Sequence, residues 1–151
     1  MNEFLSQIDA QLKQDASLEP VLRVVLKHFN SETGTIHKLD EASQLLHLAA
    51  QAGLPPHMLD IVKTIPVGKG IAGETAAKRI PVTICNLQTD KSGVAKPAAK
   101  QTGVGGALCV PITSGDTLLG TFGIGTMREH EYTAAEINSL LDVAKLVSKR
   151  L

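Results

Sequence analysis

The chain has 151 residues, of which 43% are hydrophobic and 20% charged, and its 15 Lys and Arg residues balance 15 Asp and Glu residues. This length and composition are typical of one globular domain that buries a full core. The zero net charge indicates neither nucleic acid nor membrane as a partner, and no apolar run approaches the roughly 18 residues of a membrane span. Because the N-terminal residues lack a signal-peptide pattern, we expect a cytoplasmic protein with reduced cysteines.

The first part of the chain is predicted to form helices and one β-hairpin. Residues 3–14 and 18–30 each carry an apolar stripe at helical spacing. Residues 33–40 and 45–52 favour two strands joined by a turn, and glycine and proline residues end the second strand. Apolar residues at helical spacing predict a short helix over 57–65.

The second part begins with a glycine-rich bend at 66–73, followed by a predicted helix over 73–79 and a strand over 82–87. Residues 107–113 and 117–127 are expected to pair as a second hairpin.

The last helix is predicted to run over 133–151, because Thr133 and Glu136 form a capping box ahead of an apolar stripe. Hairpins, rather than alternating strands and helices, indicate an α+β fold with a largely antiparallel sheet. We expect the terminal helices on one face and the middle helices on the other.

The glycine bend also matches a nucleotide-binding pattern, since residues 68–73 (GKGIAG) satisfy G-x-G-x-x-G. That fingerprint requires a strand immediately before it, within a βαβ unit. A helix is predicted there instead, so we favour a bend between two packed helices.

Four stretches together resemble the GAF domain family: residues 65–73 (IPVGKGIAG), 82–87 (VTICNL) followed by Asp90, 109–112 (CVPI) with 119–124 (LGTFGI), and Tyr132-Thr133. The resemblance spans essentially the whole chain and implies that residues 1–151 form a single GAF domain, standing alone or excised from a larger regulator. It implies a PAS/profilin-like six-stranded antiparallel sheet, with the terminal helices on one face and a small-molecule pocket with its lid on the other. It also implies a sensory or regulatory role in signal transduction, with homodimers formed through the terminal helices.

A strand that borders a cavity alternates between bulky core-facing residues and small or polar residues that face the cavity. On residues 82–87, Thr83 and Cys85 are expected to face it, and on residues 118–125 Thr121 and two glycines do the same. The alternative is that the glycines pack against helices and protein fills the space. The candidate ligand-binding residues, beneath a lid formed by residues 91–103, are Ile71, Ala72, Thr75, Thr83, Cys85, Lys100 and Thr121.

The predicted lid carries Lys91, Lys96 and Lys100, which either hold an anion or are simply solvated. Of the family's cyclic-nucleotide motif only Asn86 is present. The sequence therefore identifies neither the ligand nor a cofactor. His37 and His47 lie on the two strands of the first hairpin and are expected to be half-buried or exposed. No Cys or acidic residue accompanies them at metal-ligand spacing, so no metal site is expected.

Some GAF proteins of this size are free methionine-(R)-sulfoxide reductases, whose nucleophilic cysteine lies in the lid. Residues 91–106 contain no cysteine, and Gly123 and Gly125 stand where that family places acidic residues. Cys85 and Cys109 lie in predicted strands, where burial raises the pKa of a thiol. We therefore expect no catalytic residues and a sensor in which a bound small molecule shifts helix packing in a dimer. The alternatives are a reductase that uses Cys85 and Cys109, and a dimerisation module without ligand.

Overall fold

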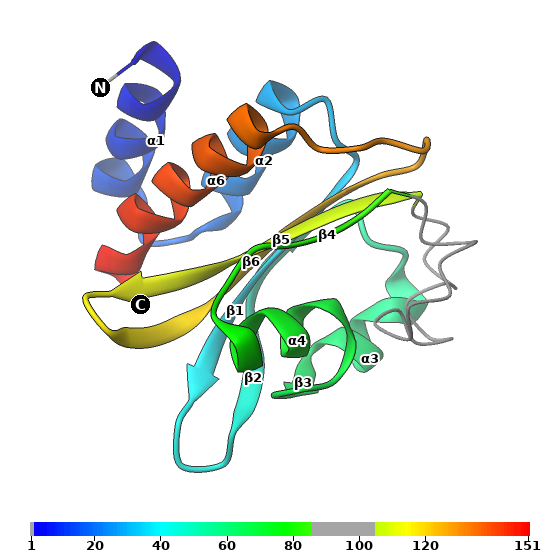
Figure 1. Ribbon diagram of the computed structural model, residues 1–151. Coiled ribbons are helices and arrows are strands. Elements are labelled where there is room, and N and C mark those ends of the chain that lie inside the picture. Colours follow the sequence, from blue (N-terminus) through cyan, green and yellow to red (C-terminus); the bar gives the residue numbers. More distant parts are fainter. Residues whose placement is uncertain (1, 86–104) are drawn as a thin grey trace.

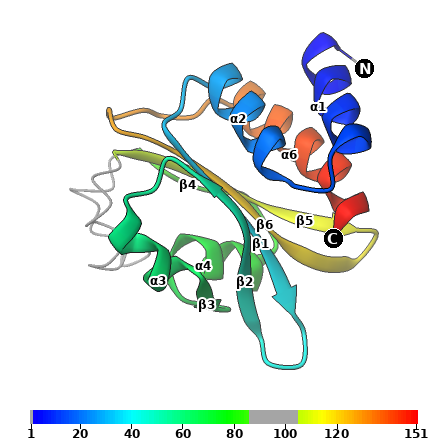
Figure 2. The same cartoon turned by 180° about the vertical axis from the view of Figure 1, so that it is seen from behind.

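The computed structural model describes residues 2–85 and 105–151, which form one sheet with helices on both faces (Figure 1). The elements in chain order are α1 (Glu3–Gln14), α2 (Glu19–His28), β1 (Thr33–Asp40), β2 (Leu45–Ala52), the 3-10 turn η1 (Pro56–Met58), α3 (Leu59–Val62), β3 (Thr64–Pro66), α4 (Gly70–Lys78), β4 (Val82–Ile84), β5 (Gly106–Ser114), β6 (Thr117–Thr126), α6 (Ala134–Val147) and the 3-10 turn η2 (Ser148–Arg150). Helices α1, α2 and α6 cover one face, and α3 and α4 lie on the other, as the views from opposite sides show (Figures 1 and 2). This layering confirms the prediction.

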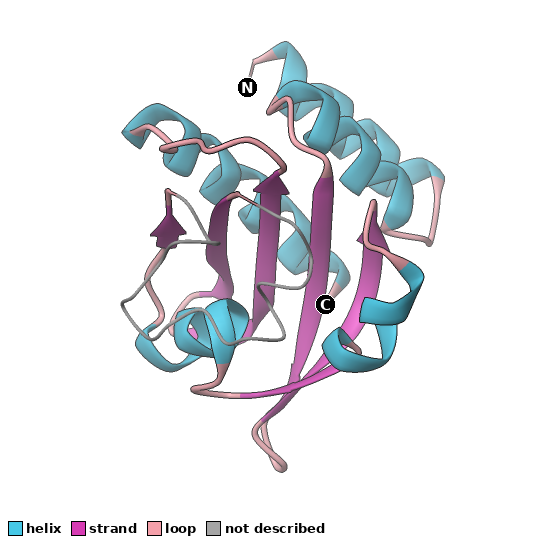
Figure 3. Cartoon of the chain, turned by 90° about the vertical axis from the view of Figure 1, so that its right-hand side faces the viewer, coloured by secondary structure: helices cyan, strands magenta, loops and turns pink. Residues whose placement is uncertain are grey.

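The six strands lie in the order β3-β2-β1-β6-β5-β4, and every neighbouring pair is antiparallel (Figure 3). Hairpins at β1–β2 and β5–β6 provide two of these pairs, and the β1–β6 pair joins the hairpins at the centre of the sheet. The expected six-stranded antiparallel sheet is therefore present, and the parallel sheet of a dinucleotide-binding fold is excluded.

A hydrophobic core fills the space between the sheet and the terminal helices. Every second residue of the central strands points into this core, as strand pleating requires. Its fully buried members come from all three helices and from the three central strands, and they include Ile8, Leu22, Ile36, Val110, Phe122 and Leu140.

Local capping fixes where the terminal helices begin. The Asn2 side chain accepts a hydrogen bond from the N–H of Leu5 at 2.8 Å and caps α1. At α6 the predicted capping box is confirmed: Glu136 N–H donates to Thr133 Oγ1 at 3.1 Å, and Thr133 N–H donates to Glu136 Oε1 at 2.9 Å. These bonds satisfy backbone donors that a helix start leaves without partners.

The predicted helix over 57–65 is wrong in its second half, because α3 ends at Val62 and β3 pairs with residues 45–47 of β2. Two β-branched residues and a following proline disfavour helix at Thr64 and Ile65, and the edge of β2 offers backbone groups that a third strand satisfies. The next helix begins at Gly70 rather than at residue 73.

The strand predicted over 82–87 is present over Val82–Ile84, which form β4. Residues 86 and 87 lie outside the described ranges. Within residues 2–85 and 105–151, no helix combines the length and apolar character that crossing a membrane requires.

Candidate functional site

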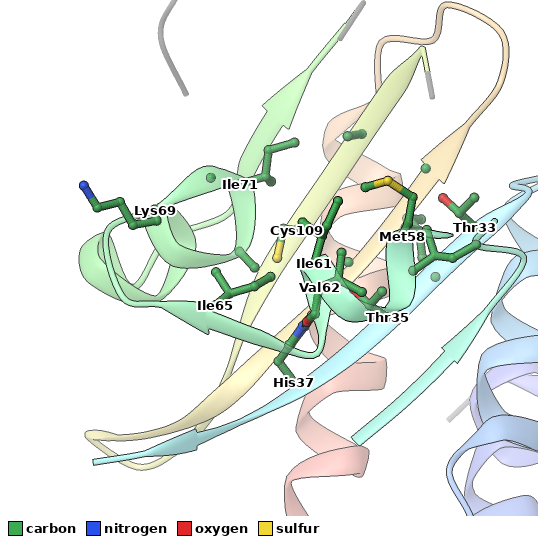
Figure 4. A pocket seen from close by; sticks show the side chains of 18 of the residues that line it. Thr33, Thr35, His37, Met58, Ile61, Val62, Ile65, Lys69, Ile71 and Cys109 are labelled. Carbon is green, nitrogen blue, oxygen red and sulfur yellow. The ribbon is translucent and has the colours of Figure 1, made fainter. Parts of the chain in front are cut away.

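A cavity of about 310 Å³ lies between the sheet and the segment that runs from η1 to the start of α4 (Figure 4). Its floor is the face of the central strands turned away from the terminal helices. The floor residues come from β1, β5 and β6, and their side chains on this face are those of Thr33, Thr35, His37, Ala107 and Cys109, beside Gly123 and Gly125. Gly34, Leu108 and Ile124 also border the cavity, although the side chains of Leu108 and Ile124 belong to the core on the opposite face.

The cavity exists because the floor side chains are small. Thr35 pairs with Gly123, which in turn pairs with Cys109, so a threonine, a glycine and a cysteine lie side by side across three strands. The adjacent residues Phe122 and Ile124 point into the core on the opposite face, as the predicted alternation along residues 118–125 requires. A valine or leucine at these floor positions would fill space that is now open.

The roof is mainly apolar and comes from α3, β3 and the first turn of α4. Met58 is fully buried, whereas Ile61 keeps 44% of its surface exposed. The roof residues are Leu54, Met58, Ile61, Val62, Thr64, Ile65, Pro66, Lys69, Gly70, Ile71 and Ala72. Such an apolar lining with few polar groups is typical of small-molecule pockets.

His37 is the most buried polar side chain of this lining, with 1% of its surface exposed. It projects from β1 toward α3 (Figure 4), and its Nε2 lies 2.8 Å from the carbonyl oxygen of Val62. Among the described residues its Nδ1 has no hydrogen-bond partner. Burial lowers the pKa of His37 below 6.5, with a smaller contribution from nearby His47, while the Val62 bond acts in the opposite direction. The ring is therefore neutral near pH 7.

Cys109 lies fully buried in the cavity floor as a free thiol. Burial raises its pKa to about 11, although the hydroxyl groups of Thr75 and Thr121 lower it in part. The Thr75 hydroxyl donates to the carbonyl oxygen of Ile71 at 2.8 Å. The Thr121 hydroxyl approaches the thiol but makes no hydrogen bond of good geometry to any described residue. At neutral pH the thiol is protonated and is a poor nucleophile.

The structure divides the predicted site residues into three groups. Ile71 and Ala72 line the cavity, as expected. Thr75 and Thr121 are buried beside the thiol of Cys109, but neither residue lines the cavity. Lys100 falls outside the described residues, as do the whole predicted lid over 91–103, its other lysines and Asn86.

Thr83 and Cys85 were assigned to the wrong face of the sheet. Thr83 pairs with Leu108, whose side chain belongs to the core under the terminal helices, and residues directly opposite each other share a face. Ile84 pairs with Ala107 of the cavity floor, so the alternation along β4 has the opposite phase to the one predicted.

Cys85 directly follows β4 and is exposed. Its Sγ lies 3.6 Å from Oε1 of Glu129. Partial desolvation and then the Glu129 carboxylate raise the pKa of Cys85. Val82 is the register partner of Cys109, so Cys85 is displaced by three residues, or about 10 Å along the sheet, from the second cysteine. The two thiols are too far apart for a disulfide in this fold.

His37 and the roof side chains of η1 and α3 were not predicted as site residues. The sequence could have indicated His37, because Thr33, Thr35 and His37 are alternate residues of β1 and therefore face the same side of a strand that borders the cavity. The expectation that both hairpin histidines are half-buried or exposed is wrong for His37, which is 1% exposed, whereas His47 is exposed and pairs with Lys38. No group of three potential metal ligands occurs among the described residues.

Comparisons with known structures find the same architecture in proteins of low sequence identity. A free methionine-R-sulfoxide reductase from Neisseria meningitidis, in complex with its substrate, is 20% identical with a TM-score of 0.81, covering 98% of this chain and 86% of that chain. The GAF domain of an Acinetobacter phosphoenolpyruvate-protein phosphotransferase is 18% identical with a TM-score of 0.82, covering 98% and 90%. The GAF domain of a phosphoenolpyruvate-protein phosphotransferase from Coxiella burnetii is 18% identical with a TM-score of 0.83, covering 98% of this chain and 90% of that chain. These likenesses establish the fold alone.

A search of curated proteins gives no significant match. The family model described as "GAF domain" matches residues 14–150, which is most of the chain and includes every element that builds the cavity. The chain therefore belongs to the GAF domain family.

Proposed function

We propose that this GAF domain is a sensory or regulatory module of signal transduction, that it binds a small molecule in the cavity, and that it acts in the cytoplasm without catalysing a reaction. The observation that carries the proposal is the cavity of about 310 Å³ between a floor of small residues and an apolar roof. A volume of this order suits a small organic ligand. Larger side chains at Gly123 and Ala107 would fill this space, which close-packed protein interiors seldom leave open.

The output of such a sensor would pass through the sheet to the terminal helices. Thr35 and Gly123 face the cavity, and the adjacent Ile36 and Phe122 pack in the helix-side core, so a shift of the floor strands is felt on both faces. A ligand produces a response only if it binds one arrangement of the helices more tightly than another.

We extend the proposal to a homodimer that forms through the terminal helices. Their partly buried apolar side chains, Leu5, Val24, Ile137 and Leu141, border the helix-side core and are available for such a contact. Sedimentation with and without ligand tests this part. A monomer under both conditions would refute it.

A reductase remains the enzymatic alternative because the thiol of Cys109 lies in the cavity floor. Against it stand the raised pKa of that thiol, about 11, and the exposed position of Cys85 away from the cavity. No acidic side chain is among the described residues that line the cavity. Turnover of methionine-(R)-sulfoxide with a thiol reductant, lost on Cys109→Ser, would establish the reductase instead.

The binding proposal is tested by native mass spectrometry for co-purifying small molecules, together with thermal shifts across a metabolite panel. Bound ligand stabilises the folded state by RT ln(1 + [L]/Kd), which makes the melting temperature depend on concentration. Gly123→Val places two methyl groups in the cavity floor and should abolish the shift. Thr83→Val, on the opposite face, should preserve it. A domain that gives no co-purifying mass and no shift would be the ligand-free dimerisation module.

A further inference from the structure

We infer that the hydroxyl group of Thr35 is the polar anchor of the cavity. The ligand is then an amphipathic small molecule that places a hydrogen-bonding group above Gly123, beside Thr35 Oγ1, and turns an apolar ring or chain toward the roof. This inference rests on the proposed small-molecule function, and it names the chemical class of the ligand and the residue that selects it.

The space above Gly123 is where a ligand can meet the floor. Gly123 lines the cavity and is only half-buried, so part of its surface is open. From the position that a Cβ atom would take on this glycine, Thr35 Oγ1 lies 3.3 Å away and Cys109 Sγ lies 3.7 Å away. The next atom, at 3.8 Å, is the backbone oxygen of Leu108, which also belongs to the floor strands. A ligand atom that rests on Gly123 therefore contacts the Thr35 hydroxyl directly.

Thr35 is the floor side chain best placed to offer a polar group at this position. Of the β1 residues that face the cavity, Thr33 and His37 are 5% and 1% exposed, whereas Thr35 is half-buried. Cys109 is buried, and its thiol is a weak hydrogen-bonding group. A hydroxyl has one donor and two acceptor sites, so Thr35 can bond to a hydroxyl, amide or carbonyl group of a ligand.

The apolar part of the ligand follows from the roof side chains that a ligand can touch. Ile65 and Ile71 are half-buried, Ile61 is exposed, and all three line the cavity (Figure 4). Covering these side chains with an apolar ring or chain removes apolar surface from water, which is favourable. A molecule with a polar group at one end and an apolar body beyond it therefore matches both the floor and the roof.

The roof also offers polar groups that could compete with Thr35. Thr64 on β3 is half-buried and lines the cavity, and the backbone at the start of α4 borders it. A ligand anchored by either of these would be indifferent to the hydroxyl of Thr35. Variants at Thr35 and Thr64 therefore separate the two arrangements.

Two probes of nearly the same shape, phenol and toluene, test the inference by NMR titration of the full chain. Each is a benzene ring with one small substituent, but the hydroxyl of phenol forms hydrogen bonds and the methyl of toluene does not. Without a partner in the cavity the hydroxyl would only lose its hydration, and toluene would bind more tightly. We expect phenol to bind about fivefold more tightly than toluene, in line with one hydrogen bond.

Variants assign the preference to Thr35. Thr35→Val removes the hydroxyl and keeps the β-branched shape, and it should reverse the preference so that toluene binds more tightly. Thr35→Ser retains the hydroxyl and should keep phenol as the tighter probe. Thr64→Val is the matched control in the roof and should leave the ratio at about five. If Thr35→Val does not fold, the two probes on the wild-type chain and on Thr35→Ser still decide the inference.

Each contrary outcome separates the inference from the proposed function. Tighter binding of toluene to the wild-type chain, abolished by Gly123→Val, would overturn the inference and leave the cavity as a ligand site. Loss of the phenol preference in Thr64→Val but not in Thr35→Val would overturn it in favour of an anchor in the roof. Binding of both probes that Gly123→Val does not weaken would remove the cavity, and with it both the inference and the proposed function.

Discussion

Two glycines on β6 give the sharpest test of how this sheet is built, because the same substitution three residues apart should be strongly destabilising at one position and nearly neutral at the other. At Gly120 an added Cβ would lie 1.9 Å from the carbonyl oxygen of His37 and 3.2 Å from the Cα of Lys38. Both are backbone atoms of β1, so no side chain can rotate away. At Gly123 an added Cβ would lie 3.3 Å from Thr35 Oγ1 and 3.7 Å from Cys109 Sγ, which are side-chain atoms at the cavity floor.

The expected costs follow from these distances. Gly120→Ala must displace β1 from β6 by about 1 Å in a close-packed interior, which strains the central pair of the sheet and its hydrogen bonds. We expect a loss of about 3–5 kcal/mol, a large part of the roughly 5–15 kcal/mol that stabilises a typical domain. Gly123→Ala needs only a small shift of Thr35. Its crowding is offset by the lower chain entropy of unfolded alanine, so the net change should stay within about 1 kcal/mol.

Urea unfolding of the two variants and the wild-type chain measures these free energies, with equal slopes confirming that the same transition is compared. The reasoning is refuted if Gly120→Ala and Gly123→Ala differ by less than about 1 kcal/mol in free energy of unfolding. A strongly destabilised Gly123→Ala would mean that the floor is already packed and that the cavity is not open space.

Three further predictions concern the pH dependence, the thiols and the α6 cap. His37 has a lowered pKa, so as pH falls below 6.5 the unfolded chain takes up its proton first and stability declines. Urea unfolding at about pH 7.5 and about pH 5.5 should show this loss, and it should be smaller in His37→Gln; an equal loss in both would contradict it. A thiol reagent should modify the exposed Cys85 in the native protein and reach the buried Cys109 only in denaturant, whereas two reactive thiols without denaturant would contradict the burial. Thr133→Ala removes the side-chain half of the capping box and should cost about 1–2 kcal/mol in thermal unfolding, with no effect expected from the exposed Thr117→Ala.

The agreement between sequence and structure is best where contiguous residues carry the information. Both strands of the first hairpin, the first two helices and the start of α6 at its capping box were predicted to within a residue or two, because periodicity and capping are properties of a short stretch of chain. The alternation on β6 also identified which face carries Phe122 and which carries Gly123. Hairpin connections then required an antiparallel sheet.

The errors occur where a distant partner decides. β3 forms only because β2 has an edge to pair with, so residues 64–66 follow a strand rather than the helical pattern of their apolar side chains. On β4, which has three residues, the face is set by its register with β5, and this register reverses the expected roles of Thr83 and Ile84.

By itself, the sequence determined the order of the elements apart from β3, the antiparallel sheet, the terminal helix layer and the family, because these depend on local propensity and on motifs within the chain. Only the tertiary structure decided that His37 is buried beneath Val62, that Cys85 and Cys109 lie apart, and that small residues from three strands meet in one floor. The physical reason is that burial, and with it the pKa and the hydrogen-bonding role of a side chain, is set by what packs over it. That neighbour here comes from residues far away in the chain.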